Sequence, residues 1–469
     1  MSSVLPFLTP SNSGIPRREI LSALSYALDL TEGAVSGHAQ RVCLYSMRIA
    51  DELQLSLTEQ SDLYYAALLK DVGCSSNSSR MCVLIGGDDR LMKRDVKFLD
   101  WTRPSVAAVT ALWRRALPGS SAVERVARIL RLAIDQHTNN RVMIELRCDR
   151  GASIARRIGL TQATADAIHR LDEHWDGSGY PGRQRGRAIP LAARILALAQ
   201  HIDVFASEIG PGMGMDEAIR EMNARSHRWF DPELVRITNE LHRTGDLARV
   251  AAIDSLHQAV QDREPQSENA LIDSDVDSIC QAFADVVDAK SPFTFSHSIG
   301  VTDAAVSIAR ALGLAPLRIQ RIYRAALLHD LGKLSVPNTI LDKPGRLTAE
   351  EFAIIQTHSR ISEQILLRIQ RFESIARIAG QHHEKLDGSG YPDRLTAAQL
   401  SLDSRILTVA DIYGALSEKR PYREALPTER VLEIMRQDVP HKIDAECFEA
   451  LCRVVGSQPS APPDLALAQ

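Results

Sequence analysis

A string of six residues, Asp-Gly-Ser-Gly-Tyr-Pro, occurs twice in this chain, at positions 176–181 and 387–392. The same separation, 387 minus 176 or 211 positions, pairs residues 194–196 with 405–407, which read Arg-Ile-Leu in both places. Self-similarity at a fixed separation is the sequence signature of a repeated architecture. Two copies of one domain are therefore expected to make up most of the chain.

Upstream of this string the two copies match at a larger separation. Residues 66–71 align with 325–330, and His38 aligns with His297, at 297 minus 38 or 259 positions. The change from 259 to 211 corresponds to an insertion of about 48 residues in the first copy. We place this insertion near residues 75–137.

The stretch between the copies predicts the domain boundaries. Residues 254–275 are polar and have no sustained apolar period, as in a linker or an exposed helix. A first domain is therefore expected over residues 1–253 and a second over 276–456. The tail, residues 457–469, contains three prolines and is predicted to be disordered.

Apolar residues in the copies recur at the spacing of α-helices. In the second copy Ile319, Ile322 and Ala326 fall at steps of three and four, and no useful length of the sequence alternates as a strand does. The sequence therefore predicts an all-α fold of two tandem helical bundles.

The charge composition excludes partners that are held mainly by bulk electrostatics. The chain has 55 Lys and Arg against 59 Asp and Glu, a formal net charge of −4, so a nucleic-acid partner is not expected. No window reaches the roughly 18 to 20 apolar residues of a membrane helix, and the N-terminus lacks the apolar block of a secretion signal. The seven cysteines form no closely spaced pair, so we expect reduced thiols rather than a disulfide framework. We expect a cytoplasmic protein with no membrane contact.

The second copy carries ionisable residues on the core faces of its predicted helices. A polar group there needs a hydrogen-bond partner or a metal ion, and a lone histidine is more often a hydrogen-bonded core residue. Here, however, seven candidates stand within 115 positions: His297, His329, Asp330, His358, His382, His383 and Asp411. Clustered His with interspersed Asp is typical of a mixed nitrogen and oxygen site for iron, manganese or zinc.

This pattern resembles the HD-GYP family of metal-dependent phosphohydrolases. The matching positions are 294, 297–298, 329–333, 358, 382–383, 387–392, 409–411 and 419–423. The resemblance implies an HD-type helical bundle around two, sometimes three, metals, usually iron or manganese. It also implies hydrolysis of the bacterial messenger cyclic di-GMP.

The resemblance distributes the seven residues over two metal ions. One ion would take His297, His329, Asp330 and Asp411, and the other would share Asp330 as a bridge and add His358, His382 and His383. Relatives with a third metal have a Glu four residues before the first histidine. That position is Phe293 here, so two divalent ions are expected.

Two dications a few ångströms apart lower the pKa of a bridging water and bind the phosphate oxygens that gain charge in the transition state. By the resemblance, Asp330 bridges the two ions. Lys333 supplies a further positive charge to the scissile phosphate. These two residues are the candidates for catalysis, and Lys333 is also a candidate for substrate binding.

The string at 387–392 cannot be a regular helix because it holds two glycines and a proline. We expect an open loop beside the site, in which Tyr391 contacts a nucleotide; a plain turn is the alternative. Arg420 and Arg423 are expected to contact the second phosphate of a cyclic dinucleotide, with an ordinary surface position as the alternative. Residues 393–400 depart from the Gly-rich stretch of relatives, which leaves the substrate preference open.

The first copy keeps His38 and Asp71 but has lost most of the ligand set. Lys70, Arg147, Leu171, Asp172 and Gln200 stand at the positions of His329, His358, His382, His383 and Asp411. Cations where two dications would sit are strongly repulsive, so no dinuclear centre is expected there. Asp71 is predicted to pair with Lys70 or Arg147 instead, and His174 and His201 are interpreted as incidental.

The sequence leaves three roles open for the first copy. It could regulate its neighbour, form a homodimer or signalling complex, or bind a nucleotide through residues 176–181 without cleaving it. The insertion, in turn, could cap a pocket or form a partner surface. For the whole chain, the leading hypothesis is a phosphodiesterase that linearises cyclic di-GMP to pGpG, with further cleavage to GMP left open. The alternatives are a metal-binding scaffold that turns over little and a hydrolase of another cyclic dinucleotide.

Overall fold

The computed structural model describes residues 14–100, 106–134, 136–209, 213–266, 270–294, 297–419 and 423–456. Within these ranges the regular structure is helical, apart from two isolated bridges. The prediction of an all-α fold is confirmed. Arg420 and the tail from residue 457, for which substrate contact and disorder were predicted, lie outside the described residues.

The N-terminal copy and its insertion consist of short and medium helices. In chain order they are α1 (Arg17–Thr31), α2 (His38–Glu52), α3 (Leu57–Leu69), η1 (Cys74–Asn77), α4 (Ser78–Ile85), α5 (Asp89–Lys97), α6 (Val106–Arg115), α7 (Ala122–Ile134), α8 (Gln136–Arg157), α9 (Gln162–His169), η2 (Gly186–Ala188), α10 (Leu191–Ile209), α11 (Met213–Ala224), α12 (Pro232–Arg243) and α13 (Asp246–Ala251).

A connecting helix and the C-terminal copy follow. They are α14 (Leu256–Asp262), α15 (Asp273–Asp288), α16 (His297–Ala311), α17 (Pro316–Leu328), η3 (Leu331–Ser335), α18 (Asn338–Leu341), α19 (Ala349–Leu366), α20 (Glu373–Gly380), α21 (Leu402–Ser417), α22 (Thr428–Arg436) and α23 (Ala445–Gly456).

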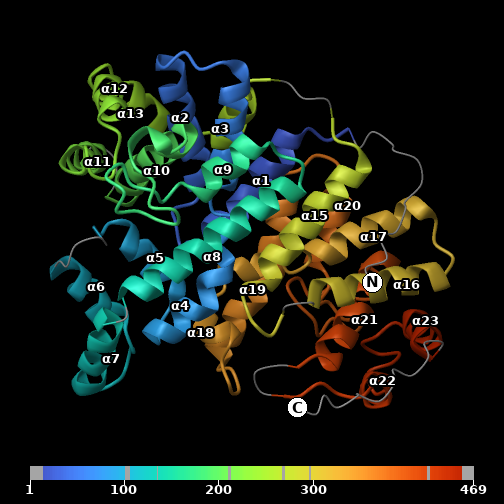
Figure 1. Ribbon diagram of the computed structural model, residues 1–469. Helices are drawn as coiled ribbons and strands as arrows, with labels where there is room; N and C mark the ends of the chain where they lie inside the picture. Colours follow the sequence, from blue (N-terminus) through green and yellow to red (C-terminus); the bar gives the residue numbers. More distant parts are fainter. Residues whose placement is uncertain are drawn as a thin grey trace, which may run out of the picture.

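The two copies lie side by side and share one hydrophobic core (Figure 1). Helix α1 of the N-terminal copy packs against η3 and α19 of the C-terminal copy, and α8 packs against α15. Polar contacts reinforce this junction: Arg150 donates a hydrogen bond of 2.7 Å to the Asp285 carbonyl, and the backbone N–H of Gln370 donates to the Glu19 carboxylate. The two copies therefore pack against each other and are not independent domains joined by a linker.

The insertion forms helices α4 to α7, and α6 and α7 extend away from both bundles (Figure 1). Helix α5 instead returns to the C-terminal copy, where the Asp89 carboxylate accepts a hydrogen bond of 3.0 Å from the backbone N–H of Asn338. Arg90, the next residue, donates to the carbonyl of Ser335 in η3. The insertion thus contacts both copies.

Part of the stretch expected to be a linker is a packed helix. Val260 of α14 is fully buried, and its carbonyl accepts a hydrogen bond of 3.0 Å from the hydroxyl of Tyr64. Among the described residues, no helix combines the length and the hydropathy that a bilayer-spanning segment needs. The cytoplasmic location inferred from the sequence stays a prediction.

Candidate metal centre

Several helices of the C-terminal copy each bring ionisable side chains to one buried centre. His297 begins α16, His329 and Asp330 follow α17, Lys333 lies in η3, His358 lies in α19, His382 and His383 follow α20, and Asp411 lies in α21. All seven predicted ligands are therefore brought together, and six of them are buried while His383 is partly exposed.

Local sequence signals explain how α19 presents His358. Thr348 and Glu351 form a capping box at its start: the Thr348 hydroxyl accepts from the Glu351 N–H at 3.2 Å, and the Glu351 carboxylate accepts from the Thr348 N–H at 2.7 Å. From this fixed start, His358, Ser362 and Ile365 follow at steps of four and three and are buried on one face. The helix thus directs His358 inward.

The carboxylate of Asp330 lies at the middle of the cluster, and its two oxygens face different histidines. Oδ2 lies 3.3 Å from His329 Nε2 and 3.5 Å from His297 Nε2. Oδ1 lies 3.4 Å from His358 Nε2 and 3.8 Å from His382 Nε2. A carboxylate that faces two separate pairs of imidazole nitrogens is placed as a bridging ligand would be.

Asp411 joins both sides of the centre. Its Oδ1 lies 3.3 Å from His297 Nε2 and 3.7 Å from His329 Nε2, and its Oδ2 lies 3.5 Å from His383 Nδ1. Burial raises the pKa of Asp411, but the hydrogen bond to His297 and the histidines around it outweigh burial and hold the pKa well below its ordinary value. Asp411 is thus an anion inside the cluster.

Three of the histidines share one hydrogen-bonding pattern. Nδ1 of His329, His358 and His382 donates to the carbonyl three residues earlier, of Ala326, Ile355 and Ala379 respectively, at 2.6 Å in each case. This bond fixes the proton on Nδ1 and turns the Nε2 lone pair toward the centre. Such outward anchoring is what metal-binding histidines usually show.

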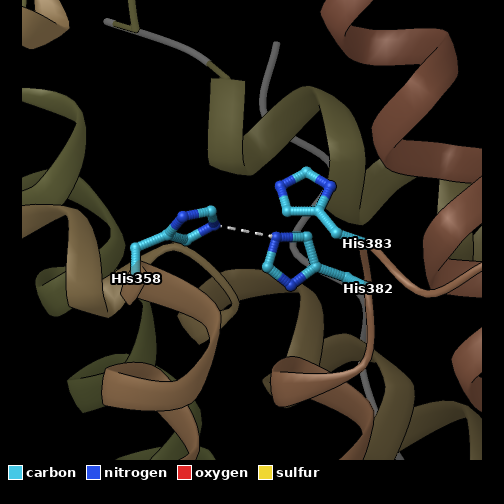
Figure 2. Close-up of side chains that lie close together, drawn as sticks. All are labelled: His358, His382 and His383. Atoms are coloured by element: carbon cyan, nitrogen blue, oxygen red, sulfur yellow. Dashed lines mark hydrogen bonds between the residues drawn. The ribbon is translucent and has the colours of Figure 1, made fainter. Parts of the chain in front are cut away.

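The histidine and carboxylate atoms that face the centre are better suited to bind a metal ion than to form hydrogen bonds with one another. His329 Nε2 and Asp330 Oδ1 are buried and have no hydrogen-bond partner among the described residues. The Nε2 atoms of His358 and His382 lie 3.2 Å apart and point toward one another (Figure 2). Because Nδ1 of each neutral ring donates to a carbonyl, neither Nε2 has a proton to donate. Burial lowers the pKa of His358 to about 3, so the ring is neutral. Buried lone pairs of this kind could be satisfied by a metal cation between them.

His297 has a further anchor that sequence reasoning missed. Its Nδ1 lies 2.9 Å from the Glu418 carboxylate. Burial lowers the pKa of His297, but hydrogen bonds to Asp411 and Glu418 outweigh it and raise this pKa to about 9. Glu418 follows Asp411 by seven residues and caps the C-terminal end of α21, so its spacing of about two helical turns was the available signal.

A second missed residue connects two of the ligand-bearing segments. The Ser362 hydroxyl of α19 donates to the His329 carbonyl at 2.7 Å and accepts from the Gly332 N–H at 2.8 Å. It therefore fixes the turn that carries Asp330 against the helix that carries His358. No feature of the sequence distinguishes this serine from an ordinary helix residue.

The predicted substrate contacts fall into two groups. Lys333 Nζ contacts the Asp330 carboxylate, and the Tyr391 ring lies 4.7 Å from the ring of His383, so both lie at the centre. Arg423 donates to the carbonyls of Ala415 and Leu416 at 2.6 and 3.1 Å. It therefore holds the end of α21, and its contact with a substrate stays a prediction.

Comparisons with known proteins agree with this geometry. A family model described as HD domain matches residues 127–234 and 281–447. The chain is 40% identical to 3′3′-cGAMP-specific phosphodiesterase 3 of Vibrio cholerae, over 96% of this chain and 97% of that protein. The chain belongs to the HD-GYP family. The expected membership among metal-dependent phosphohydrolases is thereby confirmed.

Further relatives of this HD-GYP protein match to different extents. The cyclic di-GMP phosphodiesterase response regulator RpfG of Xanthomonas campestris is 40% identical over 31% of this chain and 39% of its own. The crystal structure of a cyclic GMP-AMP-specific phosphodiesterase from V. cholerae, V-cGAP3, superposes with a TM-score of 0.65 at 36% identity. The superposition covers 95% of this chain and 99% of the V-cGAP3 chain. Both copies are thus found together in a solved protein.

The N-terminal HD-GYP copy holds ion pairs at the positions of the ligands. Lys70 Nζ contacts the Asp71 carboxylate and lies 3.0 Å from His38 Nε2. Arg147 Nε lies 3.0 Å from Asp172 Oδ2. The predicted partner of Asp71 is therefore Lys70, whereas Arg147 pairs with Asp172.

Another acidic group of the N-terminal copy is neutralised by lysines. Glu32, Asp71 and Cys74 offer ligand atoms within 4.8 Å of one another. Lys93 Nζ and Lys97 Nζ, however, each lie 3.3 Å from a Glu32 oxygen. Lysine ammonium groups occupy the space beside these carboxylates, and the expectation that no dinuclear centre forms here stays a prediction.

The Gly-Ser-Gly-Tyr-Pro loops of the two copies have the same anchor, a buried glutamate. In the C-terminal copy Glu384 accepts from the N–H groups of Asp393 and Leu395 at 2.6 and 2.9 Å. In the N-terminal copy Glu173 accepts from those of Gly182 and Gln184 at the same two distances. The loop is therefore a structural part of both copies, with or without the histidines.

Proposed function

We propose that the C-terminal copy is a two-metal phosphodiesterase that opens a cyclic dinucleotide, with 3′3′-cGAMP as its preferred substrate. The observation that carries this proposal is the position of Asp330, whose two carboxylate oxygens face two different pairs of histidines. A phosphodiester held over two cations is the arrangement of many metal-dependent phosphatases and nucleases.

The ligand assignment follows the two sides of Asp330. His297, His329 and Asp411 would hold one ion together with Asp330, and His358, His382 and His383 would hold the other. Imidazole and carboxylate ligands suit iron or manganese. Bound there, the two cations would supply a Lewis acid for the phosphate and activate the attacking water.

The surrounding residues prepare the site for a nucleotide. Lys333 is 18% exposed and contacts Asp330, so its ammonium lies between the buried carboxylate and the solvent, where a phosphate oxygen would approach. Tyr391 forms a wall beside His383, the one ligand that is partly exposed. Glu384 fixes the backbone that presents Tyr391. Lys333 and Tyr391 would therefore bind and orient the substrate, Lys333 would also offset the charge that the scissile phosphate gains, and Glu384 would position the loop.

The substrate preference rests on the full-length relative. Its name specifies 3′3′-cGAMP, and the identity of 40% extends over both copies. The match to the cyclic di-GMP phosphodiesterase RpfG covers 31% of this chain. Cyclic di-GMP, the substrate expected from the sequence, therefore becomes the second candidate. A homodimer or a signalling partner at the N-terminal copy stays a prediction.

The test is an assay of full-length protein prepared without oxygen, with the metal content measured on the same sample. We expect two metal ions per chain and faster hydrolysis of 3′3′-cGAMP than of cyclic di-GMP. Asp330→Ala should abolish hydrolysis, whereas Asp254→Ala, at an exposed position outside the site, should leave it unchanged. Bound metal without hydrolysis of either dinucleotide would favour the scaffold, and faster cleavage of cyclic di-GMP would reverse the substrate order.

A further inference from the structure

The N-terminal copy contains a cavity of about 400 Å³ between its altered site and the insertion. Its floor includes Arg147, Asp172 and Gln200, which occupy the positions of His358, His383 and Asp411. The volume falls within the roughly 300–1,000 Å³ of small-molecule binding sites. The space that holds the metal ligands in one copy therefore forms one side of a cavity in the other.

Most of the apolar residues that line this cavity belong to the insertion. Met81 and Ile85 of α4, Met92 of α5, Leu112 of α6 and Ile129 of α7 line it. None of the residues 176–181, the loop that a nucleotide was expected to use, is among the lining residues. Phosphates placed against such walls would lose their hydration without replacement. Most of a ligand that fits this cavity is therefore hydrocarbon.

One end of the cavity is polar and carries excess positive charge. Glu32 lies there between Lys93 and Lys97, so one carboxylate faces two ammonium groups. Lys93 Nζ also donates to the Ser78 hydroxyl at 2.9 Å and to the Cys74 carbonyl at 3.2 Å. Lys97 Nζ is buried, and the one carboxylate within 4 Å of it among the described residues is that of Glu32, at 3.3 Å.

The Lys97 ammonium has three N–H donors and one neighbouring carboxylate, so it can donate to a further acceptor. Burial lowers the pKa of Lys97, but the charges of Glu32 and Asp71 outweigh burial and raise it. The lining also includes Nε2 of His201, which is buried without a hydrogen-bond partner among the described residues. Buried polar atoms of native proteins are nearly always satisfied, so Nε2 of His201 and the remaining donors of Lys97 are available to a ligand in the cavity.

We infer that this cavity binds one amphipathic organic anion, with an apolar body against the insertion and a single acidic group at Lys97. The N-terminal copy would thus be a small-molecule sensor that has kept the bundle and replaced the metal centre. This site is separate from the catalytic centre and does not depend on the activity proposed for it.

The wall of the cavity is connected to the catalytic copy. Helix α5 lines the cavity through Met92 and Val96, and its first turn contacts the C-terminal copy through Asp89 and Arg90. Arg90 reaches η3, the segment that carries Lys333. A ligand that shifts α5 would therefore displace a contact of η3. Occupancy of the cavity is expected to change the rate of hydrolysis, a readout that rests on the proposed function.

The test is calorimetry of the full-length protein with dodecanoate, kept below the concentration at which it forms micelles, and with dodecanol as the uncharged counterpart. We expect one saturable dodecanoate site per chain. Ala108→Trp fills the cavity from α6 and should weaken binding at least tenfold, whereas Ala107→Trp, the exposed neighbour outside the lining, should not. Lys97→Met should weaken dodecanoate at least tenfold and leave dodecanol unchanged.

Several results would overturn this inference. They are the absence of saturable dodecanoate binding, equal affinities of the Ala107→Trp and Ala108→Trp proteins, and equal binding of dodecanoate and dodecanol to the unaltered protein. Thermal unfolding of each variant separates a filled cavity from a misfolded chain. An unchanged hydrolysis rate at saturation would refute the connection through α5. Failure of hydrolysis with every dinucleotide would instead refute the proposed function, because binding is measured separately.

Discussion

Lys70 and Asp71 form a buried ion pair at the two positions that His329 and Asp330 occupy in the C-terminal copy. The Lys70 side chain is 0% exposed and that of Asp71 is 3% exposed. Burial raises the pKa of Asp71, but the charge of Lys70 outweighs burial and holds it well below its ordinary value. An ammonium group thus takes the place of a metal cation beside the retained carboxylate.

The Lys70–Asp71 ion pair is expected to contribute to the free energy of unfolding. Lys70→Met leaves Asp71 buried without its ion-pair partner, which should lower the free energy of unfolding by about 3–5 kcal/mol. The double variant Lys70→Met with Asp71→Leu removes both charges and should cost less than the single one. Chemical denaturation of the three proteins measures this difference. A single variant as stable as the unaltered protein would show that the pair has no structural role.

The carboxylate behind His297 predicts an effect on the metal centre. Glu418→Ala removes the acceptor of His297 Nδ1 and should lower metal affinity or activity about 10- to 100-fold, as loss of such outer partners typically does. Glu429→Ala, on the exposed face of α22, is the matched control. Metal titration followed by hydrolysis assays checks both variants. Equal affinities would mean that His297 is oriented for the metal without Glu418.

Much of the fold and the candidate ligands followed from the sequence for a physical reason. The repeat predicted the number of bundles, and the change of separation between matching residues located the insertion. The seven ligand candidates could be named because metal ligands are rare residue types on core faces, where an apolar side chain is otherwise expected. His297 and Asp411 are more than a hundred positions apart, so the prediction that they converge on one ion depended on the resemblance to a family.

The remainder depends on packing between distant segments. The return of Asp89 to Asn338, the burial of Val260 and the cavity beneath the insertion are set by how helices dock, which no local pattern encodes. Ser362 was missed because a serine on a helix has no distinctive spacing. Arg423 shows the converse: a residue chosen for its charge donates to two carbonyls at a helix end.

The shared loop anchor gives a prediction with an internal control. Glu384→Ala leaves two backbone N–H groups of the loop without their acceptor, so Tyr391 is no longer fixed and hydrolysis should fall about tenfold or more at unchanged metal content. Glu173→Ala removes the same two bonds in the N-terminal copy and should leave hydrolysis within about twofold. Steady-state kinetics with metal analysis compares them. Equal losses would assign the N-terminal loop a part in turnover.

The last prediction concerns Lys290, which is 0% exposed at the junction of the copies. Its Nζ donates to the Leu334 carbonyl at 2.8 Å, and Asp89, Arg90 and Lys93 of the insertion lie nearby. Burial is the main cause that lowers the pKa of Lys290, to about 7. The folded chain therefore binds fewer protons than the unfolded chain between pH 7 and the ordinary lysine pKa of about 10.4.

Stability consequently should rise with pH across this window, because the unfolded state there holds a proton that the folded state has lost. Below pH 7 both states are protonated and the full cost of burial applies. Lys290→Met removes this titration, so the stability difference between the unaltered protein and the variant should rise with pH by up to about 1.4 kcal/mol per unit between pH 7 and 10. Urea unfolding at pH 6.5, 7.5, 8.5 and 9.5 measures it, with Lys385→Met as the control at a half-buried position. Parallel stability curves for the unaltered and Lys290→Met proteins would show that Lys290 keeps its proton in both states.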